Sequence, residues 1–271
     1  MLVEAAQSVL TQTFRDIELI IVASAATPET LETAHRIAAT DSRCRVVDLR
    51  KDSLPAARNA GIEAAGGEWV AFLDDDDLWL PNKLERQLSV DADMVNCDFI
   101  ERGGALDGIM RRIRPPDGLS IAEGFVLANY GAASASGAIV KTHLIRSLGG
   151  FDEKLQGCED WDMWRRFSWH HRVVFIDEAL VIISRHGGAM QAQRHPLHTS
   201  HVLKLIFDTP KHLRHMIPQV WVRYLGSVFE WLNERSGGVP RNIVASVYEW
   251  LNERSGGLAR KIVRYIKAAL S

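Results

Sequence analysis

The sequence is poor in several features that mark common classes of protein. Its three cysteines, Cys44, Cys97 and Cys158, are far apart and form no Cys-x-x-Cys pair, which argues against a zinc site and against a disulfide framework. Lysine and arginine number 32 against 34 acidic residues, for a formal net charge of -2, so no general attraction to nucleic acid is expected. We therefore predict a protein of the reducing cytoplasm without a nucleic-acid partner.

Long apolar runs are also missing. No stretch approaches the ~18 apolar residues that a membrane-spanning helix needs, and the N-terminus lacks the basic region and apolar block of a signal peptide. The composition, 46% hydrophobic and 24% charged, is ordinary for a soluble globular protein. With 271 residues, the chain has room for one large domain or for a domain with an appendage.

The most informative stretch is an apolar run, Trp69 to Leu73, that is followed by four carboxylates, Asp74, Asp75, Asp76 and Asp77. The run predicts a buried strand, which must end at the rim of a sheet because unpaired buried charges are costly. Crowded carboxylates repel one another unless a cation lies among them, and Mg²⁺ or Mn²⁺ prefers such oxygen ligands. The alternative is a solvated acidic turn in which Asp75 and Asp77 cap the helix that Pro81 opens.

Predicted strands alternate with predicted helices in the first third of the chain. Strands are expected over residues 17–22, 45–49 and 69–73, and helices over 29–39 and 54–65. This alternation predicts an α/β fold with a mixed, mostly parallel sheet flanked by helices. Ligands of such sheets bind at the carboxyl ends of the strands, where the Asp run lies.

Residues 55–86 resemble the nucleotide-sugar-binding half of glycosyltransferase family 2, whose members have the GT-A fold. Arg58-Asn59-x-Gly61 matches the helix that precedes the acidic strand in that family, and Asp74-x-Asp76 with the following Asp77-x-Trp79 matches its Asp-x-Asp motif. A second block, Gly149-Gly-Phe-Asp-Glu153 followed by Glu159-Asp160-x-Asp162, resembles the segment that carries the catalytic base of the family. A third match is a strand that ends near Arg185 and His186.

The resemblance implies an inverting glycosyltransferase that uses Mg²⁺ or Mn²⁺. It implies that Asp76, Asp74 and His186 hold the metal, that Arg58, Asn59, Asp74 and Asp75 contact the nucleotide-sugar donor, and that Asp160 is the general base with Glu159 and Asp162 beside it. The donor is expected to be a UDP-sugar. The acceptor is expected to be a glycan or a lipid-linked glycan, as in surface polysaccharide synthesis.

The chain departs from the family pattern at two places. Met1 already falls inside the first helix of the family, so the first strand and its loop are missing from the sequence. The second strand ends in Ala23-Ser-Ala-Ala26 instead of the acidic residues that bind the nucleobase, and an alanine side chain accepts no hydrogen bond. A degenerate, non-catalytic relative that acts as an accessory or binding protein is the alternative hypothesis.

A third hypothesis is a metal-dependent nucleotidyl or phosphoryl enzyme. The sequence has no Gly-rich phosphate loop with Lys-Ser/Thr, and this hypothesis gives the Glu159-Asp160-x-Asp162 block no function.

The last part of the chain differs in character. We predict a glycosyltransferase domain over residues 1–192 and a helical extension over 193–271. The segment 228–238 recurs as 247–257 with an offset of 19 residues, which indicates a local tandem duplication. Residues 258–270 predict an amphipathic helix with a basic face, which suits either packing on its own domain or peripheral contact with the inner face of the cell membrane.

Overall fold

The computed structural model describes residues 1–130, 135–155, 157–185 and 208–216. The chain divides into two compact units, Met1–Gly187 and Gly188–Ser271. Three sequence predictions lie outside the described residues: His186, the duplicated segment and the helix over 258–270. Within the second unit, the structure describes the short helix η3, Lys211–Met216, whose Leu213 and Met216 are buried.

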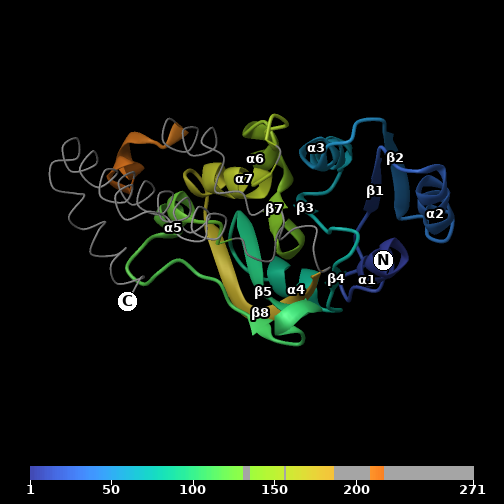
Figure 1. Ribbon diagram of the computed structural model, residues 1–271, viewed down its shortest axis with the longest axis horizontal. Helices are drawn as coiled ribbons and strands as arrows, with labels where there is room; N and C mark the ends of the chain where they lie inside the picture. Colours follow the sequence, from blue (N-terminus) through green and yellow to red (C-terminus); the bar gives the residue numbers. More distant parts are fainter. Residues whose placement is uncertain (131–134, 156, 186–207, 217–271) are drawn as a thin grey trace, which may run out of the picture. The chain divides into compact units, whose positions relative to one another are not determined.

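The first unit is an α/β structure (Figure 1). Its helices are α1 (Leu2–Leu10), α2 (Pro28–Ala38), α3 (Leu54–Ala64), α4 (Lys83–Leu88), α5 (Ile121–Leu127), α6 (Thr142–Ser147) and α7 (Glu159–Ser168), with the 3₁₀ turns η1 (Gly104–Leu106) and η2 (Ala135–Gly137). Its strands are β1 (Leu19–Ser24), β2 (Cys44–Leu49), β3 (Trp69–Ala71), β4 (Leu78–Trp79), β5 (Met94–Arg102), β6 (Met110–Arg111), β7 (Ile139–Lys141) and β8 (Val173–Ser184).

The strands form two sheets. β1 and β2 pair in parallel, and the larger sheet has the order β3-β7-β5-β8-β4, with β6 paired to β5. A mixed sheet flanked by helices was predicted and is confirmed. The prediction that most of its strands run parallel is wrong: besides β1–β2, only β5 and β8 pair in parallel, and the other described pairs are antiparallel.

Alternation along β1 determines which helices cover its two faces. Ile21 packs with Ala34 and Ile37 of α2 and with Ala6 of α1 in one apolar cluster. Val22 points to the opposite face, where its Cγ2 lies 3.6 Å from the Cβ position of Gly61 on α3. Helices therefore cover both faces of this sheet, as the alternation of strands and helices predicted.

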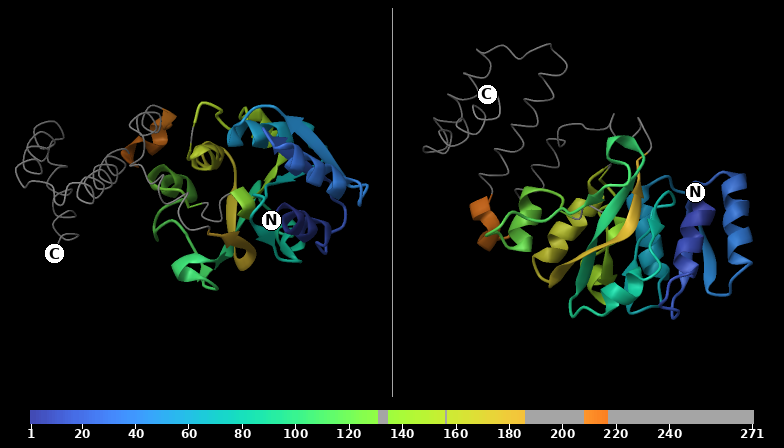
Figure 2. Two further views of the ribbon diagram at one scale, coloured as in Figure 1. Left: turned by 45° about the vertical axis from the view of Figure 1, so that its right-hand side comes forward. Right: turned by 90° about the horizontal axis from the view of Figure 1, so that it is seen from below.

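β5 and β8 lie at the centre of the larger sheet, and both are longer than their neighbours (Figures 1 and 2). Val95, Phe99, Val181 and Ile183 from these strands form the main core with α1, α4 and β7. Among the described residues, no helix is long and apolar enough to cross a membrane.

Candidate active site

The four carboxylates after β3 form a tight turn whose backbone is held by serines from two distant segments. Ser136 donates its hydroxyl to Asp77 Oδ2 at 2.6 Å and accepts the Asp74 amide at 3.1 Å. Ser184, at the end of β8, donates its amide to Asp77 Oδ1 at 2.9 Å and its hydroxyl to the Asp76 carbonyl at 2.5 Å. Arg102 donates to the same carbonyl at 3.1 Å. The turn is therefore fixed by η2, β5 and β8 together.

Asp77 is the buried member of the acidic turn. It is 3% exposed, and burial raises its pKa to about 6 despite the hydrogen bonds from Ser136 and Ser184. The prediction that Asp77 caps the following helix is wrong: Leu78 and Trp79 form the short strand β4, and α4 begins only at Lys83. A two-residue strand leaves too little sequence pattern to be predicted.

Asp74, Asp75 and Asp76 are the remaining carboxylates of the turn. Burial and the charges of Asp76 and Asp74 raise the pKa of Asp75, so these groups repel one another as they stand. Among the described residues, no three His, Cys, Asp or Glu side chains are grouped as a complete metal site. The crowded carboxylates fit an ion such as Mg²⁺, which takes one or two protein carboxylates and completes its shell with water or phosphate. His186 lies outside the described residues.

Arg58 of α3 connects the acidic turn with the start of α7. It donates Nη2 to Asp74 Oδ1 at 3.0 Å and Nη1 to Glu159 Oε1 at 2.6 Å, and it is 7% exposed. Burial alone would lower the pKa of Arg58, but Asp74 and Glu159 together with Asp160 raise it. Arg58 is thus a permanently charged link between two carboxylates that lie far apart in the sequence.

Asn59, the next residue, holds the Gly-Gly-Phe-Asp-Glu loop in place. Its Nδ2 donates to the Phe151 carbonyl at 2.9 Å and to Glu153 Oε1 at 3.1 Å, and its Oδ1 accepts the Phe151 amide at 2.8 Å. Gly150 has φ 69, and a Cβ there would lie 2.5 Å from Asn59 Oδ1. Asn59 was predicted to contact the donor, and the structure instead engages both ends of its amide with this loop.

Three aromatic rings pack the acidic turn, the loop and α7 together. The rings of Phe72 and Phe151 meet edge to face at 5.4 Å, and Trp164 of α7 lies 6.1 Å from Phe72 and 5.8 Å from Phe151. Such edge contacts suit the charge distribution of aromatic rings. The guanidinium of Arg58 lies 5.5 Å from the centre of the Phe151 ring. Arg58 therefore contacts the aromatic cluster as well as the two carboxylates.

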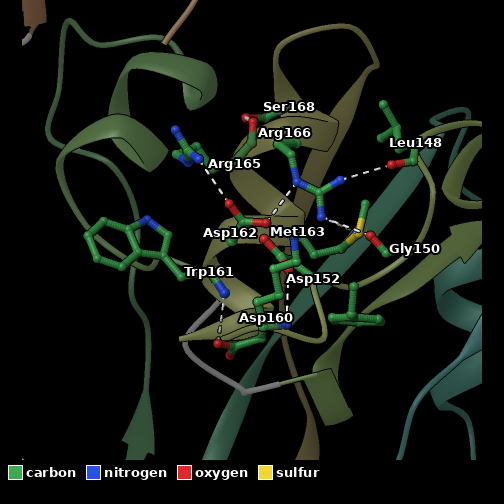
Figure 3. Close-up of polar contacts among 12 residues, drawn as sticks. Leu148, Gly150, Asp152, Asp160, Trp161, Asp162, Met163, Arg165, Arg166 and Ser168 are labelled. Carbon is green, nitrogen blue, oxygen red and sulfur yellow. Dashed lines mark hydrogen bonds and ion pairs between the residues drawn. The ribbon is translucent and has the colours of Figure 1, made fainter. Parts of the chain in front are cut away.

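The acidic residues at the start of α7 have different environments (Figure 3). Asp162 is 1% exposed and accepts from Arg165 at 2.9 Å and from Arg166 at 2.8 Å. Burial would raise the pKa of Asp162, but the two guanidinium groups lower it. Asp162 was predicted to position the acceptor or the base, whereas the structure pairs it with arginines of its own helix. The rotamers that produce this pairing are not visible in the sequence.

Asp160 is the carboxylate of this group with no arginine hydrogen-bonded to it in the contacts that the structure describes. Its Oδ1 accepts the Trp161 amide at 2.7 Å and its Oδ2 accepts from Asn129 at 3.1 Å. Burial and the neighbouring Glu159 raise its pKa, although Arg58, the Trp161 amide and Asn129 act in the opposite direction. A carboxylate with a raised pKa is suited to take up a proton.

The structure therefore brings together most of the predicted site residues. Arg58 joins Asp74 to Glu159, and Asp160 follows Glu159 at the start of the same helix. Sequence analysis assigned no role to the residues that support them: Ser136, Ser184, Arg102 and Asn129. Their only sequence signal is their polarity next to buried strands or helices.

Comparison with known proteins identifies relatives of the chain. The family model described as "Glycosyl transferase family 2" matches residues 1–142. An uncharacterized glycosyltransferase of Rickettsia felis is 27% identical over 192 residues, which cover 67% of this chain and 31% of that protein. The putative teichuronic acid biosynthesis glycosyltransferase TuaG of Bacillus subtilis is 42% identical over 104 residues, 38% of this chain and 41% of that protein. The chain thus spans less than half the length of these curated relatives.

Solved structures share the fold. The S. aureus TarS fragment 1-349 in complex with UDP-GlcNAc has a TM-score of 0.66 at 18% identity, covering 93% of this chain and 75% of that one. The mannosyltransferase PcManGT from Pyrobaculum calidifontis, in complex with GDP-Man and Mn²⁺, has a TM-score of 0.56 at 18% identity, covering 97% of this chain and 81% of that one.

Proposed function

Because the chain belongs to glycosyltransferase family 2, we propose that it is an inverting, metal-dependent glycosyltransferase acting on a nucleoside-diphosphate sugar. The observation that carries this proposal is the Arg58 bridge between Asp74 and Glu159, which joins the acidic turn to the start of α7. TarS was crystallised with UDP-GlcNAc, and TuaG is named for teichuronic acid biosynthesis. We therefore expect a UDP-sugar donor and a glycan or lipid-linked acceptor in surface polysaccharide synthesis.

In this proposal Asp76 and Asp74 hold the divalent metal, Mg²⁺ or Mn²⁺, at the acidic turn. When bound, the ion supplies positive charge that stabilises the departing diphosphate. Ser184 and Arg102 keep the Asp76 backbone in place, and Ser136 keeps the Asp74 backbone in place. The protein thus fixes the carboxylates before the donor arrives, which avoids a reorganisation cost during the reaction.

Asp160 takes the proton from the acceptor hydroxyl as that oxygen attacks the anomeric carbon. One displacement of this kind inverts the configuration and requires no covalent nucleophile. Glu159 is held by Arg58 at 2.6 Å, so its part is to maintain the charge next to Asp160 rather than to move a proton. In this proposal Arg58 lies between the donor side and the acceptor side of the site, and it fixes the positions of the Asp74 and Glu159 carboxylates relative to each other.

Calorimetric titration of UDP, and then of GDP, with and without Mn²⁺ tests the proposal on the full chain. We expect nucleotide binding that depends on Mn²⁺ and that is at least tenfold weaker in Asp76→Ala. A matched control is Asp91→Ala, since Asp91 is a surface carboxylate whose side chain is 96% exposed. Equal loss of binding in both variants, or equal binding with and without Mn²⁺, contradicts the metal assignment.

The second candidate function is a non-catalytic, glycosyltransferase-like binding or accessory protein. It is favoured by the end of β1, where Ala23 and Ser24 provide no carboxylate and the Ser24 hydroxyl is donated to the Lys51 carbonyl at 2.5 Å. The next residue, Ala25, has φ 44, a backbone conformation that glycine adopts more readily. Failure of every nucleoside diphosphate to bind in the presence of Mn²⁺ supports this second candidate.

A further inference from the structure

Asp160 is held from outside its own helix by a residue that belongs to none of the family motifs. Asn129 follows α5 and donates its Nδ2 to Asp160 Oδ2 at 3.1 Å, while the Trp161 amide occupies Asp160 Oδ1 at 2.7 Å. We propose that Asn129 is a positioning residue that fixes the carboxylate plane of Asp160 for the proton transfer assigned to it. This inference rests on the proposed function.

The structure shows why Asn129 reaches Asp160. Trp161, the residue after Asp160, donates its indole Nε1 to the Phe125 carbonyl of α5 at 2.7 Å. The Phe125 side chain is fully buried and its ring stacks on Phe175 of β8 at 6.3 Å. The same end of α7 therefore has one hydrogen bond to α5, through Trp161, and one to the residues just after α5, through Asp160.

The helix α5 has independent support at its start. Ser120 and Glu123 form a reciprocal capping box, with Ser120 accepting the Glu123 amide at 3.2 Å and Glu123 accepting the Ser120 amide at 2.8 Å. Such a box satisfies two backbone donors that a helix start leaves unpaired. Gly124 lies against Pro115, so that a Cβ there would approach the ring to 2.6 Å. Asn129 thus lies two residues after the end of a docked helix.

The charge around Asp160 gives this contact a measurable consequence. Among the described residues, Glu159 of α7 disfavours the ionised form of the carboxylate, and Arg58 of α3 favours it. Asn129 is uncharged and donates a hydrogen bond to the carboxylate, which also favours the ionised form. Removing the donor should therefore leave Asp160 harder to ionise while the two charged neighbours stay in place.

The test follows the ionisation of Asp160 directly in the full chain, by ¹³C NMR of selectively labelled aspartate carboxyl carbons, with Asp160→Asn to identify the resonance. We expect Asn129→Ala to raise the pKa of Asp160 by about 0.5–1 unit through loss of the hydrogen bond. The isosteric Asn129→Asp should raise it further, because it replaces the donor by a like charge. Hydrolysis of UDP-GlcNAc should slow in both variants with KM for the donor unchanged.

Asn82→Ala is the matched control, because Asn82 makes no side-chain hydrogen bond to the start of α4. An unchanged Asp160 titration in Asn129→Ala overturns the inference, as does the same shift in Asn82→Ala. A shifted titration in a chain that binds no UDP with Mn²⁺ means that the contact exists but the proposed function has failed.

Discussion

The acidic residues Glu159, Asp160 and Asp162 lie within one helical turn of α7 and have three different sets of partners. Glu159 is neutralised by Arg58, Asp162 by Arg165 and Arg166, and Asp160 is bound by the uncharged donors of Asn129 and Trp161. The two arginines lower the pKa of Asp162, whereas burial and Glu159 raise the pKa of Asp160, which Asn129 and the Trp161 amide offset only in part. The partners, and not the residue type, thus distinguish Asp160, the base in our proposal, from its two acidic neighbours.

At the residue scale, Asp77 provides a prediction about pH. Its folded-state pKa is raised to about 6 from an ordinary 3.8, so the folded protein binds this proton more tightly than the unfolded chain does. The stability that this proton contributes is present below pH 4 and is lost as the pH rises through 6. Wild type should therefore lose about 1.4 kcal/mol of stability from this group between pH 5 and pH 8, and Asp77→Asn, measured by urea unfolding with EDTA present, should not show that loss.

Comparison with Asp91→Asn shows whether the effect belongs to Asp77. The Asp91 side chain is 96% exposed, so this variant should follow the wild-type pH dependence within experimental error. If wild type and Asp77→Asn lose stability in parallel over this range, the buried carboxyl of Asp77 has an ordinary pKa and this prediction is wrong.

At the scale of elements, the loop from Gly149 to Glu153 depends on α3 for its shape. Asn59 makes three hydrogen bonds to it, and leaving backbone groups of the buried Phe151 without these partners costs about 1–3 kcal/mol. Asn59→Ala should lower the free energy of unfolding by that amount and slow the reaction, because α7 follows the loop. UDP affinity should change less than threefold. Asn82→Ala, which removes an asparagine without a side-chain cap bond, should cost less than about 0.5 kcal/mol.

The same elements show what sequence reasoning can reach. The place of β3 before the acidic turn could be predicted because the change from an apolar run to four aspartates is a local signal, although the strand ends at Ala71 and not at Leu73. The contact of Arg58 with Glu159 joins residues 101 positions apart, and only the family resemblance placed both in one site. Ser136, Ser184 and Asn129 could not be predicted, because a single polar residue acquires its role from the fold around it. For Asp162, the sequence motif could be recognised but the partner could not, because the side-chain rotamers determine that Asp162 pairs with Arg165 and Arg166.

At the scale of the whole molecule, ligand binding should be linked to stability. If UDP and Mn²⁺ bind the folded chain, they stabilise it by about 2.7 kcal/mol at a ligand concentration of 100 Kd. We expect UDP with Mn²⁺ to raise Tm by several degrees, EDTA to reverse the rise, and Asp76→Ala to show no rise. A Tm increase with UDP that survives EDTA contradicts a role for the metal in holding the nucleotide.

The separation of the two sheets has a consequence for the behaviour of the protein in solution. In the part of the chain that the structure describes, β1 pairs only with β2 and β3 only with β7, so each has one edge without a strand partner. The sequence of β1, Leu-Ile-Ile-Val-Ala-Ser, contains neither charge nor proline, the two features that commonly protect an exposed strand edge. Such an edge is a template on which a strand of another molecule can add. We therefore expect β1 to promote self-association at high concentration, through addition of a strand from another molecule at this edge.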